Sequence, residues 1–85
     1  MPQEIVEFAV QNQIQVLAPT DHNTIRGSRE IRELANEHGI ETIIGAEYSS
    51  DHGDIIGLFL NDDAYSRKAS EIVQEIHGQG GLTIL

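Results

Sequence analysis

Apolar residues recur at helical spacing in three stretches of the chain, and each stretch carries a residue that is typical of a helix terminus. The first begins at Pro2, which fits the first turn of a helix, and reaches residue 10. The second follows Ser28, a residue suited to an N-cap position, and ends before Gly39. The third covers residues 70–78. The pattern therefore predicts three helices, each with one apolar face.

Short apolar runs separate these helices and predict four strands. The runs cover residues 14–18, 41–44, 54–60 and 82–85. Pro19 ends the first run, because proline cannot donate a hydrogen bond to a sheet ladder, and residues 20–27 are predicted to form a polar loop. Because helices and strands mostly alternate, we expect an α/β fold of about four mostly parallel strands with three helices.

The composition limits both the kind of protein and the kind of site. The 85 residues suffice for a single domain over 1–85, and 5 Lys plus Arg stand against 14 Asp plus Glu, a net charge of −9. This charge repels phosphate backbones, so nucleic-acid binding is not expected. Cysteine is absent, so a metal site has to use His, Asp and Glu, which suit Zn, Mn, Fe or Mg. Neither a membrane-spanning apolar run nor a signal-peptide pattern occurs, and a cytoplasmic protein is expected.

Side chains that bind metals follow the predicted strands. Asp21 and His22 come after the first strand, Glu47 after the second, and Asp54 at the start of the third. Sites in parallel sheets and barrels gather at the carboxyl ends of the strands. His22 is then a candidate metal ligand, Asp21 either a ligand or a residue that orients the site, and Glu47 a bridge between two cations that activate a water molecule.

Structural explanations for these residues stay open. An Asp–His pair in a polar loop also fits a solvated turn, since Asp hydrogen-bonds its own backbone. Glu47 also fits burial beside a lysine or arginine. Asp51 and His52 are best explained as turn residues. The two remaining histidines, His38 and His77, lie at the C-terminal ends of predicted helices, where the helix dipole favours a partly charged imidazole.

Three segments together resemble a known family. VLAPTDHNTIRG, IIGAEYSSDHGDIIGLFL and EIHGQGGLTIL are similar, in order and spacing, to successive motifs of the polymerase and histidinol phosphatase (PHP) superfamily. The resemblance implies a metal-dependent phosphoesterase with a distorted seven-stranded β/α barrel. Four strands do not close such a barrel, and the family's opening H-x-H motif and its later His-Pro and D-x-H motifs are not in this sequence. The resemblance therefore implies a partial PHP domain.

The resemblance also implies a role for each candidate residue. His22 matches the metal-binding His of the T-D-H motif, Asp21 the adjacent acid with a catalytic role, and Glu47 the glutamate that bridges two metals. Asp54 stands where many members have a metal-binding His, and is a further ligand candidate.

Two functions follow from this resemblance. In the first, the full-length protein hydrolyses a small phosphorylated substrate through water activated by divalent metal ions, and this segment alone is inactive. In the alternative, the chain is a truncated, non-catalytic fold that acts as a structural or interaction unit. Open sheet edges then favour association with other chains.

Overall fold

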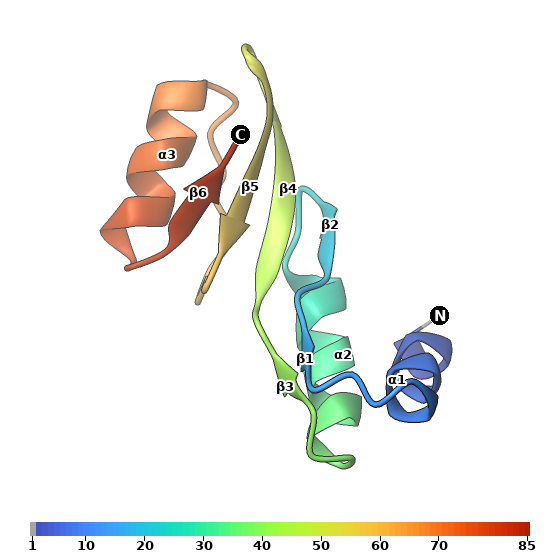
Figure 1. Cartoon of the computed structure of the whole chain (residues 1–85). Coiled ribbons are helices and arrows are strands. Elements are labelled where there is room, and N and C mark those ends of the chain that lie inside the picture. Colours follow the sequence, from blue (N-terminus) through green and yellow to red (C-terminus); the bar gives the residue numbers. More distant parts are fainter. Residues whose placement is uncertain (1) are drawn as a thin grey trace.

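The computed structural model describes residues 2–85, in which three helices and six strands follow one another (Figure 1). The elements are α1 (Pro2–Gln11), β1 (Val16–Leu17), β2 (Thr20–His22), α2 (Arg26–Asn36), β3 (Glu41–Thr42), β4 (Gly45–Ser50), β5 (Gly53–Leu58), α3 (Ala69–Gly78) and β6 (Leu82–Ile84). The three predicted helices are confirmed: the ends of α1 and α3 lie within one residue of the predicted ones, whereas α2 begins at Arg26, ahead of its predicted N-cap Ser28. No helix in this described range is long and apolar enough to cross a membrane.

The strands form two sheets, a parallel pair of β1 with β3 and a mixed four-stranded sheet in the order β2-β4-β5-β6. β1 pairs with β3 and β2 with β4 in parallel, whereas β4 pairs with β5 and β5 with β6 in antiparallel fashion. The expectation of mostly parallel strands is therefore not confirmed. Only Asp51 and His52 join β4 to β5. A connection this short permits an antiparallel hairpin, because a parallel crossover needs about a dozen residues or more.

The prediction of a loop over residues 20–27 is wrong at its start. Thr20–His22 form β2, which continues the direction of β1 beyond Pro19 and pairs with the first half of β4. Proline interrupts the ladder at one position because it has no N–H. The strand resumes directly after it, since Thr20 and its two neighbours pair with Gly45 and the residues after it.

Ser28 was predicted to be the N-cap of the second helix, and this prediction is wrong. Its hydroxyl instead explains how the sheet accommodates the interruption at Pro19. The helix α2 begins at Arg26, before Ser28, which is fully buried. The Ser28 hydroxyl accepts the N–H of Gly45 at 3.2 Å and lies 2.6 Å from the carbonyl oxygen of Pro19 and 2.8 Å from that of Gly45. The hydroxyl thus bridges the two strands where a direct backbone bond is missing.

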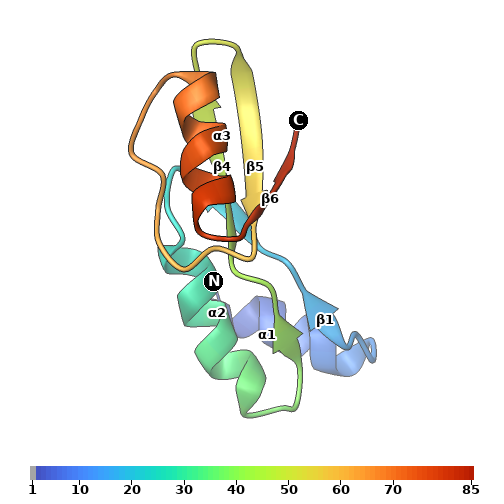
Figure 2. The same ribbon diagram turned by 90° about the vertical axis from the view of Figure 1, so that its left-hand side faces the viewer.

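Two groups of buried side chains form the core, which is almost entirely aliphatic as the composition predicts. The larger lies between α3 and one face of β4 and β5, and includes Tyr48, Ile72 and Ile76. Figure 2 shows α3 against that face of the sheet. The smaller joins α1 to α2 through Val6, Ala9, Ile31, Ala35 and Ile40. The helix α3 therefore covers one face of the hairpin, whereas His22, Glu47 and Asp54 lie on the other.

Candidate metal centre

His22 and Glu47 are brought together by the pairing of β2 with β4. The two residues are partners in the parallel register, and the imidazole Nδ1 lies 3.7 Å from the carboxylate Oε1. The side chain of His22 is 74% exposed and that of Glu47 is 25% exposed. Both side chains thus present a metal-binding atom at one accessible place, at the carboxyl end of β2, in agreement with where the sequence places such a site.

Asp54 lies on the same face of the sheet but one step further away. Residues directly opposite each other on antiparallel strands share a face, and along a strand alternate residues share it. Asp54 pairs with Ser49, and Glu47 pairs with Ile56. Asp54 is therefore a diagonal neighbour of Glu47, at roughly 7–8 Å between backbones. Within residues 2–85 no three His, Cys, Asp or Glu side chains are grouped as a metal would require.

Asp21 points away from this pair. It is the register partner of Ala46, a fully buried residue, whereas its neighbour His22 pairs with Glu47. Its carboxylate lies against Gly27 in the first turn of α2, so closely that a Cβ on Gly27 would fall 1.7 Å from Oδ2. A negative charge is favourable near a helix N-terminus. The structure therefore separates Asp21 from the pair, and its catalytic role stays a prediction.

Asn23 connects Arg67 to the strand that carries Glu47, and neither Asn23 nor Arg67 was singled out from the sequence. The N–H of Asn23 donates to the carbonyl oxygen of Glu47 at 2.8 Å, and its Oδ1 accepts the N–H of Ser49 at 3.0 Å. The same Oδ1 accepts Nη1 of Arg67 at 3.1 Å. Asn23 has a φ of +60°, a conformation that asparagine tolerates better than most residues. An asparagine directly after a candidate ligand was the available signal.

Asp51 has a structural role in the hairpin that extends the turn prediction. Its Oδ1 accepts the N–H of Ala69, the first residue of α3, at 2.8 Å, and lies 3.0 Å from Nδ1 of His52. The bond from Ala69, and after it the contact with His52, lowers the pKa of the Asp51 carboxyl. Asp51, in contact with His52, thus fastens the hairpin to the start of α3.

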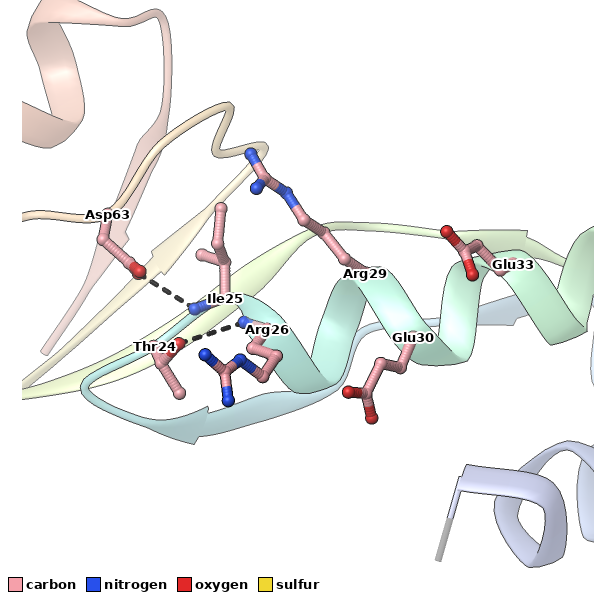
Figure 3. Close-up of a pocket in the computed structure, with 7 residues that line it drawn as sticks. All are labelled: Thr24, Ile25, Arg26, Arg29, Glu30, Glu33 and Asp63. Atoms are coloured by element: carbon pink, nitrogen blue, oxygen red, sulfur yellow. Dashed lines mark hydrogen bonds between the residues drawn. The ribbon is translucent and has the colours of Figure 1, made fainter.

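A separate surface depression of about 300 Å³ lies at the start of α2 (Figure 3). Two of its polar side chains are already paired: Asp63 Oδ1 accepts the N–H of Ile25 at 2.9 Å and the hydroxyl of Tyr48 at 2.6 Å, and Thr24 Oγ1 accepts the N–H of Arg26 at 3.1 Å. Burial, and after it the bond to Asp63, raises the pKa of Tyr48. The depression is thus explained by the start of α2, where side chains accept the first N–H groups of the helix. Neither His22 nor Glu47 lines the depression.

The donor atoms of the pair suit a shared cation. Zinc binds imidazole nitrogen and carboxylate oxygen at about 2.1 Å, so two such donors around a tetrahedral ion are about 3.4 Å apart. The observed separation of 3.7 Å is close to that value. Nitrogen and carboxylate donors also suit Mn and Fe. The pair therefore fits two positions of a divalent metal site, and further donors have to complete it.

Several known proteins share sequence similarity with this chain. No family model matches the chain. An uncharacterized protein of Methanocaldococcus jannaschii is 45% identical over 84 residues, which are 98% of this chain and 49% of that protein. An error-prone DNA polymerase of Nocardia farcinica is 44% identical over 48 residues (56% of this chain), and a PolC-type DNA polymerase III of Ureaplasma parvum is 34% identical over 59 residues (69% of this chain). Each match covers 4% of the polymerase.

A solved structure shares the arrangement of helices and strands. It is a two-domain protein of Bacteroides vulgatus that contains a predicted PHP-like metal-dependent phosphoesterase, and it matches 96% of this chain and 29% of its own with a TM-score of 0.83. At 21% sequence identity this likeness concerns the fold. The chain thus has a mixed α/β fold found in a protein with a PHP-like part, and spans about half the length of its archaeal relative.

Proposed function

We propose that this chain is part of a PHP-type metal-dependent phosphoesterase and that His22 and Glu47 contribute ligands to its metal site. The observation that carries the proposal is their juxtaposition, with donor atoms 3.7 Å apart at the carboxyl end of a parallel strand pair. The PHP-like neighbour in fold and the order of the T-D-H and G-A-E segments support the same assignment.

Each residue has a defined part in the proposal. His22 would hold a divalent ion through its imidazole, and the carboxylate of Glu47 would hold the same ion and a second one. Asp54, on the same face, joins as a further ligand, while Asp21 positions β2 against α2 through its contact with the first turn of that helix. A divalent cation, whether Zn, Mn, Fe or Mg, would supply positive charge to a phosphate ester and acidify a water molecule.

The proposed substrate is a small phosphorylated molecule. The net charge of −9 would repel a small phosphorylated molecule, with its few charges, much less than it would repel a nucleic-acid backbone. The two polymerases contain a similar segment in a few percent of their length, so their names carry no substrate over to this chain.

A second function is favoured by one specific surface. Leu82 and Ile84 of the edge strand β6 are 52% and 44% exposed, and lie on the same face as Glu47 through their pairing with Leu58 and Ile56. Exposed apolar side chains on an unpaired strand edge promote pairing with another chain. A structural or interaction unit built on this edge is therefore the alternative to an enzyme.

The test compares the complete gene product with this 85-residue chain. Metal content per chain is measured by mass spectrometry after dialysis, together with hydrolysis of p-nitrophenyl phosphate. The phosphoesterase proposal expects bound divalent metal and turnover in the complete product, and weak or no turnover in the shorter chain. A complete product that folds, retains no metal and hydrolyses nothing would favour the interaction unit instead.

A further inference from the structure

Arg67 is hydrogen-bonded to the residue that follows His22, although it lies 45 residues after His22 in the chain. Its Nη1 donates to Oδ1 of Asn23, the residue that directly follows His22. The N–H of Asn23 in turn donates to the carbonyl oxygen of Glu47. Asn23 therefore links the guanidinium of Arg67 to the backbone at His22 and at Glu47, the two candidate ligands.

The anchoring of Arg67 is well defined at both ends. Asn23 Oδ1 also accepts the N–H of Ser49, which fixes the direction of its amide group. The carbonyl oxygen of Arg67 accepts the N–H of Asp51 at 3.0 Å, which ties this loop to the hairpin between β4 and β5. The guanidinium is thereby restrained, and less conformational entropy is lost when it binds a ligand.

Most of the guanidinium is still available for binding. Arginine has five N–H donors in a planar fork, and a single nitrogen contacts Asn23. No carboxylate in residues 2–85 lies within 4 Å of it, although the chain has 14 Asp plus Glu. The fork geometry matches the oxygens of a phosphate group.

We infer that Arg67 is a substrate-binding residue, and that it holds the phosphoryl group of the ester next to His22 and Glu47. This inference rests on the proposed phosphoesterase function. A cation at this place offsets the carboxylates of Glu47 and Asp54, which would otherwise repel a phosphate before it reaches the metal. Asn23 is a positioning residue in this arrangement, because it touches Arg67 and the strands rather than the substrate.

The experiment uses the complete gene product loaded with Mn²⁺ and compares Arg67→Gln with Lys68→Gln. The second variant removes the same charge from the adjacent residue, whose ammonium makes no hydrogen bond in the described part of the chain. Arg67→Gln is expected to raise the KM for p-nitrophenyl phosphate and the inhibition constant of inorganic phosphate at least about tenfold, the usual effect of losing a hydrogen bond to a charged group. The metal content and melting temperature stay at the values of the unmodified protein, and Lys68→Gln leaves all four quantities unchanged.

Other outcomes separate this inference from the proposed function. Arg67→Lys keeps the charge and is expected to recover part of the phosphate affinity, which also guards against a folding defect in Arg67→Gln. Equal KM values for Arg67→Gln and Lys68→Gln in an active enzyme would overturn the role of Arg67 alone. If the unmodified protein shows no turnover, calorimetry with inorganic phosphate decides. Binding that Arg67→Gln abolishes supports the anion site without the hydrolase, and binding that it leaves unchanged overturns the site.

Discussion

His22 and Glu47 face each other across two parallel strands, with the imidazole Nδ1 3.7 Å from the carboxylate Oε1. Neither side chain is part of the core, and His22 is largely exposed. Parallel register alone thus brings together two residues that are 25 positions apart in the sequence. Their proximity contributes little to the free energy of unfolding, as is usual for exposed polar contacts, and it is the basis of the proposed metal site.

The first prediction concerns the ligands themselves. His22→Ala or Glu47→Gln in the complete gene product should lower bound metal and phosphate-ester hydrolysis by more than about tenfold, since even indirect partners of metal sites have effects of that size. The free energy of unfolding in the presence of a chelator should change by no more than about 0.5 kcal/mol, as for most surface substitutions. His38→Ala, an exposed histidine after α2, is the matched control and should leave the metal content unchanged. Full metal retention in both ligand variants would remove the pair from the site.

A second prediction tests the contact between Asp21 and Gly27. A Cβ at position 27 would lie 1.7 Å from Asp21 Oδ2, so Gly27→Ala has to displace the carboxylate. In the Asp21→Ala background this obstacle is gone, and the same substitution should stabilise the fold by up to about 1 kcal/mol through helix propensity. Urea unfolding of both single variants and the double variant gives the coupling between the two positions. Additive effects would mean that the carboxylate does not occupy this place.

Metal affinity measured on the same variants tests whether Asp21 positions β2. If it does, Gly27→Ala and Asp21→Ala should each weaken metal binding, and the double variant should be no weaker than Asp21→Ala. A metal affinity that is unchanged in all three variants would limit Asp21 to the stability of α2.

The sequence predicts the elements of this fold better than their arrangement. Helical periodicity located α1, α2 and α3, because each buries one stripe of apolar residues. The direction of β5 was missed because it depends on the two-residue link after Ser50, and the apolar run over 54–60 fits a parallel or an antiparallel strand equally well. Turn length was the stronger signal here.

The candidate site was predicted only in part, for a related reason. The spacing of strands indicated that His22 and Glu47 lie near each other, and the register confirms this proximity. In a strand, neighbouring side chains point to opposite faces, which separates Asp21 from His22. Because residues 20–22 were predicted to form a loop, this alternation was not applied to them. Arg67 was not foreseen because its contact with Asn23 joins residues 44 positions apart through a loop without a periodic pattern.

A third prediction concerns Ser28, whose hydroxyl links two strands where Pro19 has no N–H. Ser28→Ala leaves the buried N–H of Gly45 without its partner and takes the hydroxyl from the carbonyl oxygen of Pro19. The free energy of unfolding should fall by about 1–3 kcal/mol, the cost of leaving a buried polar group unsatisfied. Ser70→Ala, an exposed serine in the first turn of α3, should change it by no more than about 0.5 kcal/mol. Equal stability of the two variants would show that water replaces the hydroxyl.

The last prediction is a dependence of stability on pH through Asp51. The N–H of Ala69, and after it the ring of His52, lowers the pKa of this carboxyl below the ordinary value of 3.8. Because the folded state then binds the proton less readily than the unfolded state, the stabilisation is fully present above pH 3.8 and is lost as the pH falls through the lowered pKa.

Urea unfolding from pH 7 to pH 2 measures this effect. Asp51→Asn should be less stable than the unmodified chain at pH 7, and the difference should shrink below about pH 4. Glu7→Gln, at an exposed position of α1, should show a difference near zero at both ends of the range. A destabilisation by Asp51→Asn that is as large at pH 2 as at pH 7 would mean that the shape of the side chain at the start of α3, rather than its charge, fastens the hairpin to the helix.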